Sequence, residues 1–254
     1  MLDDILFYGG EKEMYDLVIN IIGGLICAMI LFLLTKLFLG WKNYPGIKRM
    51  YRIAREYTKA GGINFFSSRQ AYIKFKDHGT ASNYLSKAES NIIYVGFWLA
   101  HSVEIGNVIE TIKSLLETGK KVVIVLIDPD SDIINYCSKF LGLNNIEIKN
   151  RIVNSIRKFC CMYDNLSIEA KKRFTLKLHS VPISASAFLI DNELNYGKTL
   201  VDFKLYNYCR DDGFGMEFHK KGYPLYDKFT KSYKAIAEEA KEIDYQKYFE
   251  NIIG

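Results

Sequence analysis

The longest apolar run in the chain lies near its N-terminus, over residues 17–34, where Asn20 is the one clearly polar side chain. The run continues, with an interruption at Lys36, as far as Trp41. A helix this long and apolar on every face is typical of a transmembrane span, with Lys36 reaching the headgroups and Trp41 at the interface. A buried soluble helix would usually keep a polar face. We therefore predict a transmembrane helix over residues 17–41.

The charges on the two sides of this run predict its orientation. Acidic residues predominate in residues 1–16, whereas basic residues predominate in residues 42–60. The positive-inside rule then places residues 1–16 outside the cell (inner) membrane and residues 61–254 in the cytoplasm. A cleaved signal peptide is the alternative. The acidic N-terminal region and the missing small-residue cleavage motif both disfavour it.

A basic helix is expected directly after the span, over residues 42–60. It follows the break at Pro45-Gly46, and Gly61-Gly62 ends it. Its basic residues recur at spacings of four, three and four, which puts them on one helical face: Lys48, Arg52, Arg55 and Lys59. Beside a bilayer such a stripe is attracted to anionic headgroups. A solvated helix face explains the same pattern equally well.

The remainder of the chain, residues 61–254, alternates between strand-like and helix-like patterns, which indicates an α/β domain. Continuous apolar runs predict buried strands, and apolar residues at spacings of three and four predict helices. Strands are expected at 71–75, 91–96, 121–127, 174–179, 185–190 and 215–218, and helices at 79–90, 103–117, 131–141, 146–163 and 223–248. A strand, a helix and a second strand over residues 91–127 imply a parallel pair.

Composition excludes some functions and leaves others open. The net charge of +5 is too modest to indicate dedicated nucleic-acid binding. The five cysteines have no metal-ligand spacing and are interpreted as reduced thiols in a cytosolic domain. Asp128, Asp130 and Asp132 alternate, but Pro129 and the lack of a following glycine and glutamate do not fit a calcium loop. Acids at a helix start explain them better, so no metal and no cofactor are expected.

The most informative stretch runs from Ser184 to Asp191 and is followed by Gly197. Its spacing resembles the phospholipase D superfamily signature, H-x-K-x-x-x-x-D followed by G-S-x-N. In this resemblance Asp191 takes the position of the aspartate and Gly197 that of the glycine. Ser184 then takes the position of the histidine, and Ser186 that of the lysine. The flanking segments 62–69, 92–96 and 120–129 follow in the order found in phospholipase D-like proteins.

The resemblance implies a phospholipase D-like mixed sheet flanked by helices, but without the family's reaction. That reaction needs a histidine to attack phosphorus and a lysine to neutralise the phosphate oxygens. Serine replaces neither without an activating base. His179 lies near the motif, but Val181 and Ser186 stand where a signature beginning at His179 would need lysine and aspartate. We interpret His179 as a strand-end residue that makes a backbone hydrogen bond.

Polar side chains at the predicted strand ends could line a ligand pocket. These residues are Asp128, Ser184, Ser186, Asp191 and Glu217. Open α/β sheets bind ligands beyond the carboxyl ends of their strands. A small phosphorylated or nucleotide ligand is one candidate for such a pocket. Turn and cap roles are the alternative for Asp128 and Asp191.

The predicted membrane helix also carries small residues at the spacing that favours helix association. Gly23 and Gly24 are each followed four residues later by another small residue, Cys27 and Ala28. Small-xxx-small pairs let helix backbones approach closely in lipid, and Asn20 could add an interhelical hydrogen bond. We expect a homo-oligomer, although glycines are also simply common in membrane helices.

Together these patterns predict a single-pass membrane protein with a catalytically silent phospholipase D-like domain that acts as a sensor and effector. By analogy of architecture, it resembles membrane-disrupting effectors of prokaryotic antiphage defence. The alternative is a membrane-tethered phosphodiesterase or nuclease with a non-standard nucleophile, such as Ser184, Ser186 or His179. A third possibility is a structural membrane anchor for a partner protein.

Overall fold

The computed structural model describes residues 29–32, 45–67, 81–99, 107–207, 213–220 and 224–245. The chain divides into two compact units, Met1–Glu56 and Tyr57–Gly254.

The described part of the first unit is helical. Residues 29–32 form a helical turn, and helix α2 (Pro45–Lys59) begins at the expected proline, whose fixed φ suits the first turn of a helix. The chain leaves α2 through Gly61, whose φ of 90° is one that glycine adopts without strain. No described helix combines the length and hydropathy of a membrane span. The predicted span, with Gly23, Gly24, Cys27 and Ala28, lies outside the described residues apart from positions 29–32.

The described residues of the second unit build an eight-stranded mixed sheet in the order β1-β7-β6-β5-β2-β3-β4-β8. Strands β2, β3 and β4 are parallel, and the other neighbouring pairs are antiparallel. The strands are β1 (Gly62–Phe66), β2 (Asn91–Val95), β3 (Lys121–Ile127), β4 (Phe174–His179), β5 (Ala185–Ile190), β6 (Lys198–Phe203), β7 (Phe214–His219) and β8 (Lys241–Glu242).

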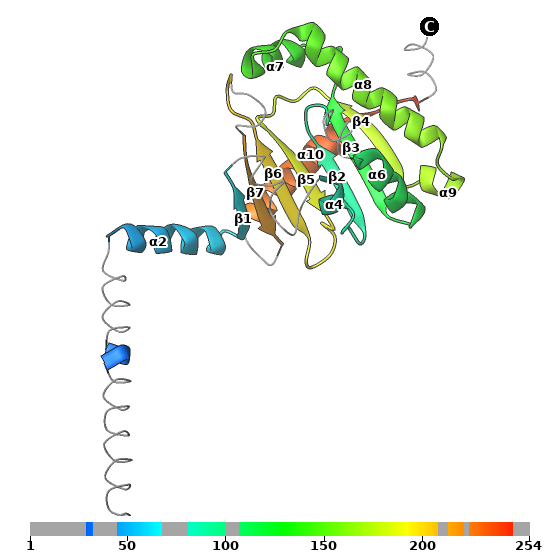
Figure 1. Ribbon diagram of the computed structural model, residues 1–254. Coiled ribbons are helices and arrows are strands. Elements are labelled where there is room, and N and C mark those ends of the chain that lie inside the picture. The colour runs from blue at the N-terminus through cyan, green and yellow to red at the C-terminus, as the bar shows by residue number, and fades with distance from the viewer. Residues whose placement is uncertain are drawn as a thin grey trace, which may run out of the picture. The chain divides into compact units, whose positions relative to one another are not determined.

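Helices cover both faces of this sheet (Figure 1). One face carries α4 (Ala81–Leu85), α6 (Val108–Glu117), α7 (Ile133–Leu141) and α8 (Asn145–Asp164), and the short α9 (Ile168–Lys171) lies beside α6; the other face carries α10 (Pro224–Glu239). The central strand β3 is buried on both sides because Ile124 and Leu126 belong to the core under α6 and α8, whereas Val125 belongs to the core under α10.

Most of the expected elements are confirmed. The limits of β4 and β5 are as predicted, and β2 and β3 form the expected parallel pair. Strands β1 and β6 were not expected, and the predicted strand at 71–75 lies outside the described residues. The predicted long helix over 223–248 is wrong at its C-terminal end. The chain turns at Ala240, and β8 adds to the edge of β4.

One buried carboxylate joins the antiparallel part of the sheet to the parallel part. Asp191 follows β5 directly, in the left-handed region at φ 51°, and its N–H donates to the Asn91 carbonyl oxygen at 2.8 Å. Its carboxylate accepts the N–H groups of Glu89 (3.0 Å), Ser90 (2.7 Å) and Asn91 (3.2 Å). Asp191 thus holds the end of β5 to the start of β2, and its role is structural.

We predict that Asp191→Asn lowers the free energy of unfolding by about 1–3 kcal/mol, because a neutral amide replaces a carboxylate that accepts several buried N–H groups. Asparagine tolerates the left-handed backbone, so the substitution isolates the charge. The control is Asp130→Asn, because the Asp130 side chain is 87 % exposed. This substitution should change the free energy of unfolding by less than about 0.5 kcal/mol. Chemical denaturation of the two variants checks this. Equal, small losses would contradict the role assigned to Asp191.

Candidate functional site

A cavity of about 610 Å³ lies beyond the carboxyl ends of β3 and β4. Its lining comes mainly from the loop between β3 and α7 and from the first turns of α7. The lining residues are Asp128, Asp130, Ser131, Asp132, Ile133, Tyr136 and Ser180. This is the edge of the sheet at which α/β proteins commonly bind ligands.

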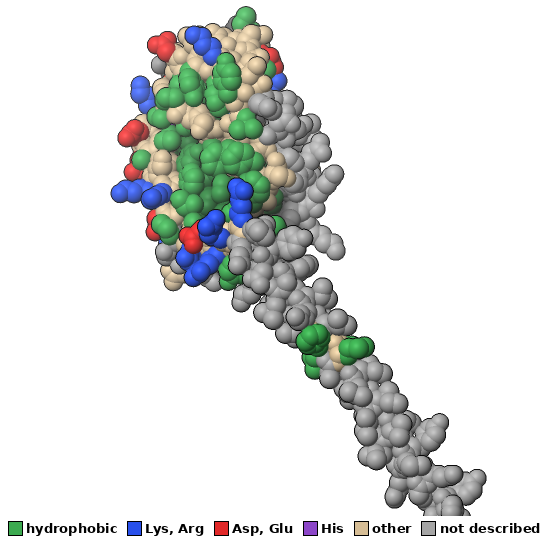
Figure 2. All heavy atoms as spheres, turned by 90° about the vertical axis from the view of Figure 1, so that its left-hand side faces the viewer, with side chains coloured by type: hydrophobic (Ala, Val, Ile, Leu, Met, Phe, Trp, Pro, Cys, Tyr) green, Lys and Arg blue, Asp and Glu red, His purple; other side chains and the backbone are tan. Residues whose placement is uncertain are grey.

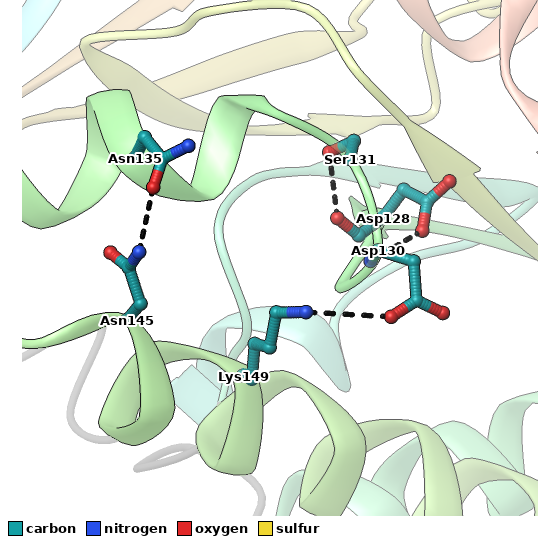
Figure 3. Close-up of polar contacts among 6 residues, drawn as sticks. All are labelled: Asp128, Asp130, Ser131, Asn135, Asn145 and Lys149. Atoms are coloured by element: carbon teal, nitrogen blue, oxygen red, sulfur yellow. Dashed lines mark hydrogen bonds and ion pairs between the residues drawn. The ribbon is translucent and has the colours of Figure 1, made fainter.

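The loop after β3 is held by its own hydrogen bonds (Figure 3). The Asp128 carboxylate accepts the N–H of Asp130 at 2.9 Å, and the Ser131 hydroxyl donates to the Asp128 carbonyl oxygen at 2.7 Å. Asp128 therefore has the turn role considered from the sequence and also lines the cavity. Asp132 precedes α7, where a negative charge is favourable near the helix N-terminus.

Two contacts connect this loop and α7 to α8 (Figure 3). Lys149 lies 3.6 Å from the Asp130 carboxylate, and the Asn145 amide donates to the Asn135 side-chain oxygen at 2.6 Å. The site thus combines acidic and hydroxyl groups with one lysine at its side. Over the described ranges, no group of three or more His, Cys, Asp or Glu residues is arranged to hold a metal ion.

His179, the last residue of β4, is buried next to this edge. Its Nδ1 accepts the N–H of Val181 at 3.2 Å, so the proton resides on Nε2, which lies 3.4 Å from the Gly96 carbonyl oxygen. Burial lowers the pKa of His179, although the two backbone hydrogen bonds and Asp128 oppose the shift. The imidazole is neutral near pH 7, and both of its nitrogens are engaged. It is thus the hydrogen-bonded strand-end residue that we expected.

The two serines of the signature positions lie at the start of β5. Ser184 is exposed, whereas Ser186 is buried close to Gly96, where a Cβ would clash with the hydroxyls of Ser186 and Tyr94. In the register of β5 and β6, Ser186 is directly opposite Asp202. Side chains opposite each other in an antiparallel pair lie on the same face.

Asp202 is a residue that the sequence analysis missed, because strand β6 was not expected. Its carboxylate forms an ion pair with Lys204, and the pair is partly shielded from solvent. Beside them, the Tyr233 hydroxyl donates to the Ala185 carbonyl oxygen at 2.9 Å, and burial raises the pKa of Tyr233. Ser186 and Asp202 therefore belong to a polar cluster in which the carboxylate already has a cationic partner.

Asp191 does not lie with Asp128 and the serines. Strand β5 runs antiparallel to β2, so Ala187 is opposite Val95 at the end of β2, and Ile190 is opposite Ile92 near its start. Ser184 and Ser186 thus lie toward the sheet edge that carries Asp128, whereas Asp191 lies at the opposite edge. The structure thus brings the serines to the same edge of the sheet as Asp128 but not into the lining of the cavity, and it does not bring Asp191 to that edge.

Glu217 of β7 is buried in a separate cluster with Asn64, Tyr84 and Lys198. Asn64 Nδ2 donates to its carboxylate at 2.7 Å, and the Tyr84 hydroxyl donates to it at 3.1 Å. Lys198 Nζ lies 3.9 Å from the same carboxylate and 4.4 Å from the centre of the Tyr84 ring. These contacts assign Glu217 a structural role in joining β1, β6 and β7 to α4.

The environment of Glu217 changes the acidity of its neighbours. Burial lowers the pKa of Lys198, and the negative charge of Glu217 opposes that shift. Burial and then the charge of Glu217 raise the pKa of Tyr57 to about 12, so this phenol stays protonated. Lys198 is a second residue that sequence analysis missed, for the same reason as Asp202.

The comparisons with known proteins find similarity only at the level of structure. No family model matches the chain, and no curated protein matches it. Phosphatidylserine synthase of Haemophilus influenzae Rd KW20 is similar with a TM-score of 0.47 and 14 % sequence identity, over 66 % of this chain and 37 % of that chain. The chain thus spans little more than a third of that protein's length.

Two further solved structures are similar at lower scores. Nuc from Salmonella typhimurium, a phospholipase D family member, has a TM-score of 0.35 and 12 % identity, over 64 % of this chain and 87 % of that chain. TrmBL2, an archaeal chromatin protein whose structure shows a mode of DNA binding, has a TM-score of 0.36 and 12 % identity, over 64 % and 48 % of the two chains. These matches are likenesses in fold over about two thirds of this chain, and they assign it neither an activity nor a ligand.

Proposed function

We propose that the protein is a membrane-anchored, non-hydrolytic binding module, in which a cytoplasmic domain senses a ligand and a membrane helix produces the response. The proposal rests on one observation: the groups that a phospholipase D-like reaction would use are either replaced or already hydrogen-bonded. Ser184 and Ser186 occupy the histidine and lysine positions of the signature, and both ring nitrogens of His179 are engaged. In the strand register of the described residues no histidine is opposite these serines, and Ser186 is opposite Asp202.

The cavity beyond β3 and β4 is the proposed ligand site. Its three aspartates favour groups that donate hydrogen bonds, such as the hydroxyl and amino groups of a nucleotide, over a bare phosphate. Lys149, beside Asp130, is the cation available to a phosphate of a small phosphorylated ligand. Ser131 and Ser180 supply neutral partners in the same lining.

Self-association is the proposed means of response. The small residues Gly24 and Ala28 of the predicted span favour close helix packing. Figure 2 shows hydrophobic side chains gathered on the face of the second unit that carries α7, β7 and β1. The exposed apolar residues of these elements and of the segment after β6 are Phe65, Tyr136, Leu205 and Tyr206. A large exposed apolar area is typical of an interaction surface.

Membrane disruption in antiphage defence is the biological setting that we propose for this assembly. The support for it is architectural: a sensing domain of modest size is joined by one short helix to a single predicted span.

We predict no turnover of phosphodiester substrates by the purified full-length protein, because no described side chain is placed to form a phosphohistidine. Bis(p-nitrophenyl) phosphate and phosphatidylcholine serve as substrates, and buffer alone sets the background. Turnover that Ser186→Ala or Asp202→Asn abolishes would contradict the proposal. It would favour the alternative, a phosphodiesterase with Ser186 as nucleophile and Asp202 as its base.

We predict that Gly24→Ile reduces both crosslinked oligomers in membranes and the toxicity of overexpression, because the larger side chain keeps the helices apart. The matched control is Ile26→Leu, which lies about 200° away on a helix and preserves hydropathy. Crosslinking of membranes from expressing cells, together with growth curves, measures both effects. Toxicity that persists fully in a monomeric Gly24→Ile variant would remove assembly in the membrane from the mechanism.

A further inference from the structure

Helix α2 has two chemically different faces. Its described basic residues are Arg49, Arg52, Arg55 and Lys59. Between them lie large apolar side chains that are exposed, with Met50 71 % and Ile53 58 % exposed to solvent. Tyr57, the next residue along this face, packs against Phe218, whereas Met50 and Ile53 remain exposed. Their exposure calls for an explanation, because a soluble helix usually buries its apolar face.

The spacing of these residues places most of the basic ones away from the apolar ones around the helix. Met50 and Ile53 are three residues apart, so they lie on neighbouring positions of one face. Arg52 and Arg55 each follow one of them by two residues, which is about 200° around an α-helix. Met50 and Ile53 therefore point away from the face of Arg52, Arg55 and Lys59, whereas Arg49, four residues before Ile53, lies at the edge of the apolar face. Tyr51, also exposed, lies at the boundary between the two faces.

The chain itself indicates what covers the apolar face. Three residues separate Trp41, the end of the predicted span, from Pro45, and the four steps from one Cα to the next reach at most about 14 Å. A helix held this close to a bilayer, with an apolar face and an arginine-rich face, has the pattern of helices that lie in the membrane interface. Its basic residues complement the negative charge of the cytoplasmic leaflet.

We propose that α2 is an interfacial helix that lies in the plane of the membrane. Met50 and Ile53 enter the boundary between headgroups and acyl chains, and the arginines extend to the phosphates of anionic lipids. Tyr51 lies at the headgroup level, where an aromatic ring with a polar end is favoured. The inference deepens the proposed membrane anchoring and rests on it. It assigns a lipid-binding role to the apolar residues of α2 in addition to its basic stripe.

Site-specific photocrosslinking in the full-length protein tests the proposal. A diazirine amino acid replaces Met50 or Ile53 on the apolar face, Arg52 or Arg55 on the basic face as matched controls, and Leu31 in the predicted span. Each variant is reconstituted into phosphatidylcholine vesicles with and without phosphatidylglycerol. Mass spectrometry then identifies what each position has captured.

The expected result is several-fold more lipid adduct at Met50 and Ile53 than at Arg52 and Arg55, with a further increase when phosphatidylglycerol is present. Equal adducts on both faces, no effect of phosphatidylglycerol, or capture of a second copy or of the protein's own domain at Met50 would overturn the proposal. Lipid adducts at Leu31 but none on α2 would overturn it and leave the anchor standing. Absence of lipid at Leu31 would contradict the anchor itself.

Discussion

The buried carboxylate of Asp191 is the interaction on which the arrangement of the second unit depends. It accepts backbone N–H groups from Glu89, Ser90 and Asn91, so it ties the end of β5 to the start of β2. At this junction the sheet changes from three parallel strands to an antiparallel set. Because β5 must begin at the far edge in order to end here, Ser184 and Ser186 lie at the sheet edge that carries Asp128.

In the same arrangement, the carboxylates that stabilise the fold are separate from the polar groups beyond the carboxyl ends of β3 and β4. The carboxylates of Asp191 and Glu217 both hold elements of the fold together. That of Asp191 accepts backbone N–H groups, and that of Glu217 accepts hydrogen bonds from side chains. At the opposite edge, His179 is neutral and hydrogen-bonded, and Asp202 is paired with Lys204. Among the described groups at this edge, Ser184 is exposed, and so are Asp130 and Asp132 of the cavity.

Much of the fold was predictable because the buried strands are continuous apolar runs. Strand β3 is the clearest case, since both of its faces contact helices. Strand β6 was missed because Lys198 and Asp202 interrupt its apolar pattern, and only their partners Glu217 and Lys204 explain their presence. Strand β8 was read as helix because its placement depends on distant contacts, including the Tyr245 hydroxyl that accepts the N–H of Leu176 at 2.8 Å. Such contacts leave no local pattern.

Part of the candidate site was predictable because the buried strands that carry it could be recognised from their apolar runs. Asp128 could be placed at the carboxyl end of β3 from the sequence, because a parallel pair was expected there. Asp191 could not be placed correctly, because the local sequence pattern of β5 or β2 does not determine the direction of one strand relative to the other. Asp202 required the pairing of β5 with β6.

The central claim is the proposal that no described side chain of this protein forms a covalent phosphoryl intermediate. Intact-protein mass spectrometry tests it directly, after brief incubation of the full-length protein with a phosphodiester substrate and denaturation at neutral pH, which preserves phosphohistidine. The account predicts that the protein mass is unchanged. A phosphoryl adduct that maps to His179, Ser184 or Ser186 would contradict it.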